Sequence, residues 1–349
     1  MITATGSYIP TLKVTNDHFQ SHAFFDGDGT KIDLPNTEII RKFQEITCIN
    51  ERRYVTEDLN TSDIAFLAAE NALEGMDRES LDYIIVGQNL GEVKQNSLRS
   101  DTVPTIAARV KHMLGIRNPY TIAYDVPFGC PGWLHGVILA DCHIRSGDAK
   151  KVLVIGAETL SRVSDPHDRD SMIYSDGAGA TLVEATDREA GILSHATRSD
   201  TLNEAFLLWM GKSNNPDFNG DNLYLKMHGH EIYKYAVRTV PDVVKRSLDK
   251  AGLTLTDVEK LLIHQANQKM DEAILKRLFK LYKVVKIPEH IMPMTISWLG
   301  NSSVATLPTL YDLLMKGKLN NHRLQPGHII VFASVGAGMN VNSLVYRMP

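Results

Sequence analysis

A cysteine inside the sequence FGCPGW has the clearest potential for covalent chemistry in this chain. Cys130 lies between Gly129, which permits an unusual backbone angle, and Pro131, which suits the first position of a helix. The sulfur is therefore expected at a helix N-terminus, where unpaired N–H groups and the helix dipole favour a thiolate. Because free cysteines are often buried and inert, we assign Cys48 and Cys142 to the core and only Cys130 to nucleophilic chemistry.

A nucleophilic thiol needs polar partners, and two distant segments offer them. His264, in LLIHQANQKM, is expected at the carboxyl end of a strand, where catalytic groups gather in α/β folds. Asn301, in SWLGNSSVATLP, is expected at the start of a buried helix. A lone histidine is most often a hydrogen-bonded core residue, and the chain has 13, so His264 stands out only through its place in an internal repeat.

The internal repeat comprises the strands and helices that must position Cys130, His264 and Asn301. Three segments recur in the same order, as a strand, a helix and a second strand. The apolar runs YIIVG, VLVIG, LLIH and IIVFA are typical of strands covered by helices on both faces. The matching pairs are 76–89 with 253–267, 128–148 with 299–319, and 149–160 with 327–338.

The repeat predicts an α/β protein made of two related halves, residues 1–190 and 191–349. The apolar helices that follow Cys130 and Asn301 are expected to lie in one central layer shared by both halves. Cys130 and Asn301 would then face each other, with His264 beside them. Pro308 predicts a kink or a late start in the second of these helices.

Composition narrows the possible classes of protein. A net charge of −4 does not suggest a nucleic-acid-binding surface, and no apolar run reaches the roughly 18 residues of a membrane span. The first residues do not resemble a signal peptide. Three cysteines without a close pair argue against a disulfide framework and a zinc site, and they fit a reducing, cytoplasmic setting. Segment 22–38 contains Asp26 and Asp28, and its turn residues favour a hairpin or loop over a calcium site.

Across nearly its whole length the chain resembles the β-ketoacyl-acyl-carrier-protein synthase III family of the thiolase-like superfamily. The resemblance is carried by ATGSYIP, MLGI, FGCPGW, DPHDRDSMIYSDGAGATLVEA, MHGHEIYKYAV, IHQAN, GNSSVATLP and GAGMNVNSLV. It implies a thiolase-like fold of two pseudo-symmetric halves in αβαβα layers. It also implies a catalytic set of Cys130, His264 and Asn301, in agreement with the pairing above.

The resemblance implies a decarboxylative condensation. Cys130 would accept an acyl group from a thioester, and a malonyl thioester on acyl carrier protein would then lose carbon dioxide. His264 and Asn301 would hydrogen-bond the thioester oxygen as the carbanion forms, and the carbanion would attack the acyl-cysteine to give a 3-oxoacyl thioester. The backbone N–H groups of Cys130 and Gly338 would form the oxyanion hole.

Substrate contacts are also implied by the resemblance. Arg169 matches a coenzyme A contact of the family, and Gly229 and Tyr233 fall in a matching substrate-binding segment. The family's adenine-stacking Trp is absent from IIRKFQEITCINERR, so an acyl-carrier-bound starter is an alternative to acyl-CoA. Val103 stands where the family has a Phe at the dimer contact, which predicts a longer pocket and a starter longer than acetyl. These departures suggest a specialised ketosynthase.

The implied partners are acyl carrier protein, acyl-CoA and a second copy of the chain, with no cofactor beyond the thioester substrates and no metal. A basic helix is expected to dock the acidic carrier protein through Lys269, Lys276, Arg277 and Lys280, although a solvated basic face is an equal alternative. Three other functions stay open: a cysteine-dependent thioester hydrolase, a relative that transfers the acyl group to an alcohol or amine, and a non-catalytic partner subunit.

Overall fold

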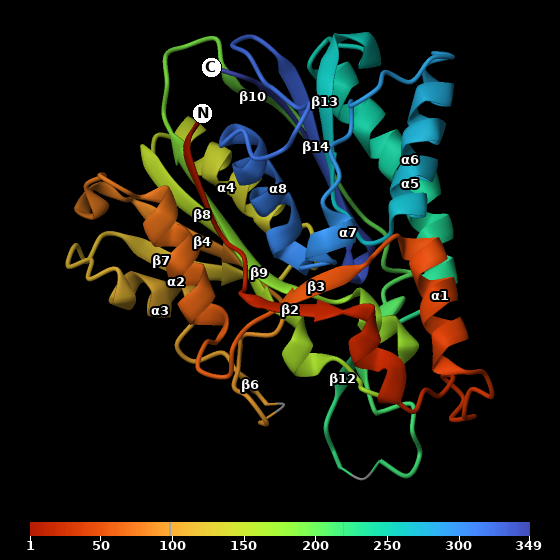
Figure 1. Ribbon diagram of the computed structural model, residues 1–349. Coiled ribbons are helices and arrows are strands. Elements are labelled where there is room, and N and C mark those ends of the chain that lie inside the picture. Colours follow the sequence, from red (N-terminus) through yellow and green to blue (C-terminus); the bar gives the residue numbers. More distant parts are fainter. Residues whose placement is uncertain (98, 219) are drawn as a thin grey trace.

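Two mixed β-sheets organise the chain in the computed structural model, which describes residues 1–97, 99–218 and 220–349 (Figure 1). The N-terminal sheet has five strands in the order β1-β9-β8-β4-β7. Strand β4 runs parallel to β7 and β8, whereas β9 is antiparallel to both β8 and β1. Its strands are β1 (Ile2–Tyr8), β4 (Tyr83–Gly87), β7 (Ile122–Val126), β8 (Lys151–Thr159) and β9 (Asp176–Glu184).

The C-terminal sheet repeats most of this plan. It has four strands in the order β10-β15-β14-β13, with β13 parallel to β14 and β15 antiparallel to both of its neighbours. Strands β13 and β14 therefore correspond to β4 and β8, as the sequence repeat predicts, and β15 and β10 correspond to β9 and β1. The strands are β10 (Gly191–Ser199), β13 (Val258–Ile263), β14 (Ile329–Gly336) and β15 (Asn340–Arg347).

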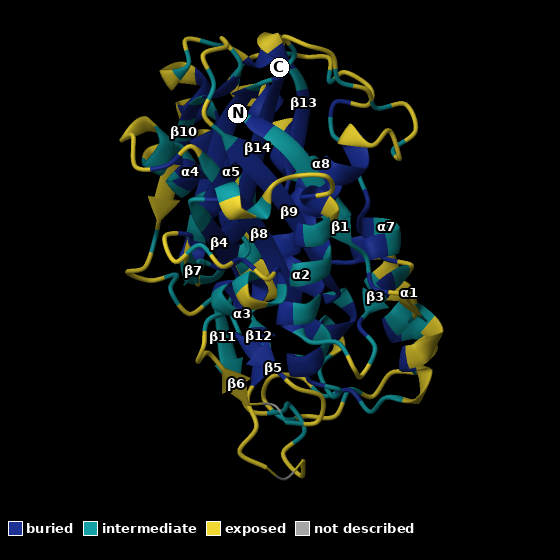
Figure 2. Ribbon diagram, turned by 90° about the vertical axis from the view of Figure 1, so that its left-hand side faces the viewer, coloured by how far each residue is buried: buried dark blue, intermediate teal, exposed yellow. Residues whose placement is uncertain are grey.

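Helices α4 (Gly132–Arg145) and α8 (Thr306–Met315) form the layer between the two sheets (Figure 1). Each helix contacts strands of both sheets, and their apolar side chains share one core with those strands. Helices that are apolar nearly all round are stable only when covered on every side, which explains their central position. Figure 2 shows the strands beside this layer, such as β8, β9 and β14, as buried.

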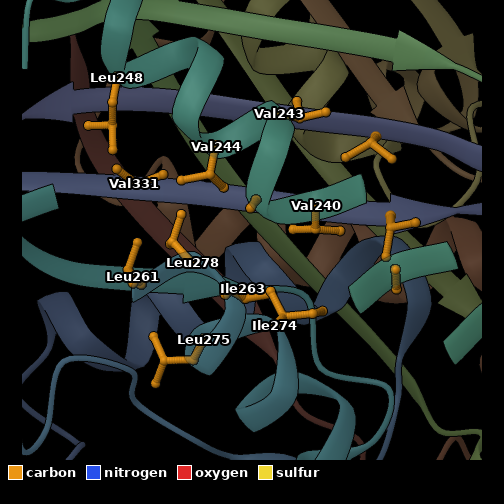
Figure 3. Close-up of a cluster of buried hydrophobic side chains, with 14 of the residues drawn as sticks. Val240, Val243, Val244, Leu248, Leu261, Ile263, Ile274, Leu275, Leu278 and Val331 are labelled. Atoms are coloured by element: carbon orange, nitrogen blue, oxygen red, sulfur yellow. The ribbon is translucent and has the colours of Figure 1, made fainter. Parts of the chain in front are cut away.

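The outer layers complete the αβαβα arrangement. Helices α2 (Thr61–Ala72) and α3 (Ile106–Met113) cover the outer face of the N-terminal sheet, and α5 (Gly229–Lys250) and α6 (Gln268–Leu281) cover that of the C-terminal sheet. Figure 3 shows the second core, where valines of α5 and aliphatic side chains of α6 meet Leu261, Ile263 and Val331 of the sheet. The predicted α/β, thiolase-like fold class is confirmed.

Shorter elements surround one end of these layers. Within segment 22–38, residues 25–31 form a hairpin turn, with a bridge between Phe25 and Lys31 and an Asp26 N–H that donates to the Thr30 carbonyl, and the last three residues begin α1 (Asn36–Thr47). These peripheral elements are β2 (Leu12–Thr15), α1, β3 (Glu51–Tyr54), β5 (Glu92–Val93), β6 (Ser100–Asp101), β11 (Leu208–Gly211), β12 (Tyr224–Met227) and α7 (Ile296–Leu299).

The sheets divide the chain at one place in the sequence. Strands of the N-terminal sheet come from residues 2–184 and those of the C-terminal sheet from residues 191–347. This division supports our proposal of two halves, 1–190 and 191–349. Among the described residues, no helix combines the length and the apolar character that crossing a bilayer requires.

Candidate active site

The turn that carries Cys130 is pressed against a turn from the other half of the molecule. Gly129 has a φ of 66°, as the sequence predicts, and a Cβ at that position would lie 2.6 Å from the Ala337 nitrogen. A Cβ on Gly336 would in turn lie closer than 3.0 Å to the Cys130 nitrogen. Only glycines allow this approach, so backbone N–H groups of both halves reach the sulfur's surroundings.

Cys130 directly precedes Pro131, which caps the N-terminus of α4 and lies one residue before the first helical position that the sequence predicts for it. The expected preference for a thiolate is offset in the structure, because burial raises the pKa of the Cys130 thiol to about 11. A hydrogen bond from Ser303 acts in the opposite direction, and the charge of Glu158 adds to the rise in pKa. The resting thiol therefore holds its proton near neutral pH, and the thiolate must form when a thioester is bound.

His264 lies directly after β13, at the strand end that the sequence predicts. Its backbone N–H donates to the Ala333 carbonyl of β14 over 2.8 Å, three residues before Gly336 meets the Cys130 turn. Only 2% of His264 is exposed, and burial lowers the pKa of its imidazole to about 4. A neutral imidazole at neutral pH can donate one N–H to a substrate oxygen without carrying a charge into the site.

Backbone hydrogen bonds fix Asn301 to the N-terminal half of the molecule. Its N–H donates to the Ile173 carbonyl over 3.0 Å, and its own carbonyl accepts from the Ser175 N–H over 2.8 Å. The side-chain Oδ1 accepts from the Ser303 N–H over 2.8 Å. With the oxygen engaged in this way, the Nδ2 group is left to donate elsewhere.

The helix expected after Asn301 begins late, as Pro308 predicts. A short turn, η6 (Ser303–Ala305), intervenes, and α8 starts at Thr306 with Pro308 in its first turn. This late start leaves Asn301 outside any helix and Ser303 in the η6 turn, from which its hydroxyl reaches the Cys130 turn. The Ser303 Oγ lies 3.6 Å from the Cys130 Sγ, and this contact joins Asn301 to the cysteine through one residue.

The structure links two of the three predicted residues and places the third on a strand end that leads toward the Cys130 turn. Cys130 and Asn301 are linked through Ser303, and His264 is fixed to β14 just before that strand meets the Cys130 turn. Gly338 lies in the next turn, η7 (Ala337–Met339), with a φ of 73°. The contacts to the Cys130 turn come from its neighbours Gly336 and Ala337.

A cavity of about 760 Å³ lies in the periphery of the fold, and its lining includes none of Cys130, His264 and Asn301. Its walls come from the 25–29 turn, residues 168–170, strands β11 and β12, and the start of α5, including the predicted residues Arg169 and Gly229. The Arg169 Nη2 lies 3.4 Å from the Asp26 Oδ1 of the hairpin turn. Tyr233 lies one helical turn beyond Gly229 and is partly exposed. Val103 is 81% exposed and lies outside this wall.

Tyr174 lies at the end of the segment that supplies Asp168, Arg169 and Asp170 to the cavity wall. It follows η4 (Arg169–Ile173) and forms a parallel bridge with Asn301. Burial raises the pKa of the Tyr174 phenol well above its usual value, and the charges of Asp170, Asp168 and Cys130 add to that rise. Among the described residues its buried hydroxyl has no hydrogen-bond partner.

The predicted docking residues share one exposed side of α6. Lys269, Lys276 and Lys280 follow each other at intervals of seven and four residues, and Arg277 is adjacent to them. Within the part of the chain that the structure describes, no carboxylate lies within ion-pair distance of these four cations. We call Lys269, Lys276, Arg277 and Lys280 the α6 ridge. Its positive charge is not neutralised by carboxylates of the described residues and is available for a partner.

Sequence reasoning missed five residues of the site: Asn89, Glu158, Tyr174, Ser303 and Asp26. Glu158 could have been noticed as a carboxyl group inside the apolar run VLVIGAETL, and Ser303 as the second serine after Asn301. Asn89 lies two residues after β4, in the segment that matches the one containing His264. The contact between Asp26 and Arg169 joins residues about 140 positions apart and leaves no local signal.

Comparison with known proteins identifies close relatives over the full length. Family models of 3-oxoacyl-[acyl-carrier-protein (ACP)] synthase III match residues 124–201, and of its C-terminal part residues 248–348. A relative from Xanthomonas campestris pv. campestris, named β-ketoacyl-[acyl-carrier-protein] synthase III, is 34% identical over 99% of this chain and 97% of its own.

Solved structures agree with this similarity. A β-ketoacyl-[acyl-carrier-protein] synthase III from Thermus thermophilus superposes with a TM-score of 0.81 and 29% identity, over 100% of this chain and 99% of the other. The 3-oxoacyl-[acyl-carrier-protein] synthase III from Aquifex aeolicus VF5 gives a TM-score of 0.79 and 29% identity, over 99% of both chains.

Proposed function

Since the chain belongs to the 3-oxoacyl-[acyl-carrier-protein] synthase III family, it is a condensing enzyme of fatty-acid biosynthesis, and we propose that Cys130 carries its acyl group. The observation that carries this proposal is the meeting of Cys130, the Ser303–Asn301 pair and the His264-bearing strand end. Cys130 and its helix come from the first half of the chain, and His264 and Asn301 come from the second.

In the first half-reaction the Cys130 sulfur attacks the carbonyl carbon of an acyl thioester. A bond forms between Sγ and that carbon, the donor's own C–S bond breaks, and the released thiol takes the proton that Cys130 loses. The bond types on the two sides are the same, so the step is close to thermoneutral. We propose that the Cys130 N–H and the Gly338 turn, which begins at Ala337, hold the oxyanion of the tetrahedral intermediate.

In the second half-reaction a malonyl thioester loses carbon dioxide, and the electron pair of the broken C–C bond passes to the thioester oxygen. We assign stabilisation of that oxygen to the His264 N–H and the Asn301 Nδ2. Both donors are neutral and fixed before substrate binds, so they favour the charge that develops during decarboxylation. The carbanion then attacks the acyl-cysteine, which frees the Cys130 thiolate and yields the 3-oxoacyl thioester.

The charges of the cavity support a carrier-bound starter. Asp26 occupies one side of Arg169, and Lys226 is held by Asp165 and Asp168. Further carboxylates of Asp28, Asp170 and Glu231 line the same wall. With Lys212 included, the wall has five carboxyl groups against three cationic side chains, and this surplus of negative charge disfavours the nucleotide phosphates of coenzyme A. We therefore assign starter delivery to acyl carrier protein docked on the α6 ridge, with an acyl chain longer than acetyl.

A homodimer is also part of the proposal. Strand β7 is the edge of the five-stranded sheet, and Ile122 on it and the preceding Tyr120 expose apolar surface. An unpaired apolar edge is suited to pairing with a second copy. Val103 would then contact the pocket across the dimer, as the resemblance implies. The cytoplasm is the proposed compartment, and the thioester substrates are the proposed reactants without a further cofactor.

Mass spectrometry of the intact protein tests the nucleophile and the donor together. The protein is incubated with acyl-CoA and acyl-carrier donors from two to twelve carbons, and the acylated residue is located by peptide mapping. We expect one acyl group on Cys130, faster from carrier donors and from chains longer than acetyl. The matched variants are Cys130→Ala, which should not be acylated, and Cys142→Ala, which should behave as wild type.

Acylation at another residue, or equal acylation of Cys130→Ala, would contradict the assigned nucleophile. Clear preference for acetyl-CoA would leave Cys130 in place but overturn the proposed starter and its carrier.

A further inference from the structure

Ser303 holds the two predicted catalytic side chains at once. Its hydroxyl donates to the Cys130 Sγ over 3.6 Å, and its backbone N–H donates to the Asn301 Oδ1 over 2.8 Å. The residue has a φ of 53°, a left-handed conformation that serine rarely adopts. Strain of this kind persists only where the surroundings determine the backbone, and such positions cluster at functional sites.

A second set of hydrogen bonds fixes the direction of the Ser303 hydroxyl. The Asn89 Nδ2 lies 3.3 Å from the Ser303 Oγ and 2.7 Å from the Glu158 Oε2. The Asn89 backbone N–H also donates to that carboxyl oxygen over 3.1 Å. An amide nitrogen can only donate, so the serine oxygen must accept from Asn89. Its own proton is thereby left to point at the sulfur.

In this set of hydrogen bonds, Glu158 accepts from Asn89 and does not itself contact the Cys130 sulfur. It is fully buried on β8, and burial raises the pKa of its carboxyl group to about 8, so it is mostly uncharged at neutral pH. An ionised Glu158 would raise the pKa of Cys130. A neutral carboxyl group still accepts from Asn89 through Oε2 and adds no opposing charge.

The groups that act on Cys130 or interact with it come from three parts of the fold. They are Glu158 of β8, Tyr174 after η4, and the Asn301–Ser303 segment. Among the residues that the structure describes, the side-chain hydrogen bond to Sγ comes from Ser303. The Cys130 side chain is only partly exposed, so a fixed hydroxyl donor has a larger effect on the thiolate than it would in open water.

We propose that Ser303 is a positioning residue that stabilises the Cys130 thiolate, and that Asn89 and Glu158 orient its hydroxyl toward the sulfur. The inference deepens the proposed function, on which it rests through the assignment of Cys130 as nucleophile. It adds a source of thiolate stability at a site where burial opposes ionisation. It also couples the nucleophile to the amide, because one residue holds both.

The pH dependence of Cys130 alkylation by iodoacetamide tests this proposal without any condensation. Ser303→Gly removes the hydroxyl, keeps the N–H that Asn301 needs, and suits the positive φ, so the variant should fold. A hydrogen bond to a charged group shifts a pKa by about one unit, so we expect about tenfold slower alkylation at pH 8. Asn89→Ala should change the rate in the same direction by a smaller factor.

Ser302→Ala is the matched control, because the Ser302 hydroxyl pairs with Thr306 and not with Cys130. Its alkylation profile should coincide with that of the wild type. The proposal is overturned if Ser303→Gly reacts within twofold of wild type at pH 8, or if the control slows equally. If wild-type Cys130 is not acylated by any thioester, the proposed function is contradicted. The alkylation and acylation experiments therefore distinguish a failure of the Ser303 proposal from a failure of the proposed function.

Discussion

The side chains of this site are controlled by burial more than by charge. Cys130, His264 and Glu158 all lie in low-dielectric surroundings, and each has its pKa displaced toward the neutral form. Neutral groups give the site directed hydrogen bonds without fixed charges before substrate binds. Charge then develops on the reacting atoms alone, where the surrounding donors are aimed.

Glu158 makes stability depend on pH in a direction that can be measured. The folded protein keeps the Glu158 proton up to about pH 8, whereas the unfolded chain loses it near its ordinary pKa of 4.5. The unfolded state binds fewer protons between these values, so the free energy of unfolding falls as pH rises through this window and levels off above it. The slope is at most about 1.4 kcal/mol per pH unit.

Urea unfolding from pH 6.5 to 8 should therefore show a flatter profile for Glu158→Gln than for wild type. This pH range lies above the pKa values of Asp170 and Asp176, which burial raises only to about 6. Titration of these two groups therefore contributes little to the measured slope. Glu74→Gln, at an exposed position, should keep the wild-type slope. Parallel profiles for Glu158→Gln and wild type would show that Glu158 is not held neutral.

At the level of elements, the site depends on how closely two turns approach. The Cys130 turn follows β7 and the Gly336 turn follows β14, so strands of different sheets deliver the backbone groups that meet. The sequence predicted the strands, the buried helices and the special backbone of Gly129. It could not predict the contact between the turns, because that depends on how the two sheets pack across the central helices.

Gly336→Ala tests that approach. The new Cβ would overlap the Cys130 nitrogen and lie 2.8 Å from the Pro131 Cδ, so the Cys130 turn must shift. We expect acylation of Cys130 to fall by at least tenfold and stability to fall by about 1–3 kcal/mol. Gly177→Ala is the control, because its Cβ would meet Ser302 at an ordinary 3.4 Å. Similar acylation rates in the two variants would contradict the role of the close turns.

On the scale of the whole molecule, duplication explains why distant residues share one site. Equivalent strands end on the same side of each half, so the residues after β13 and β14 face those before α4. The internal repeat is the reason that we propose Cys130, His264 and Asn301 as one site. The hydrogen bonds that join Asn89, Glu158 and Ser303 were not predictable from the sequence. These are ordinary polar residues, and their hydrogen bonds form only after the two halves pack together.

The account as a whole requires that both halves act in one decarboxylating condensation. The most direct measurement starts with the protein acylated on Cys130 and adds malonyl-[acyl-carrier-protein] labelled with ¹³C at the carboxyl group. Wild type should release one labelled carbon dioxide for each 3-oxoacyl product detected by mass spectrometry, and His264→Ala and Asn301→Ala should each release it at least a hundredfold more slowly while still accepting the acyl group. Hydrolysis of the acyl-enzyme without labelled carbon dioxide, or undiminished release in both variants, would contradict the account.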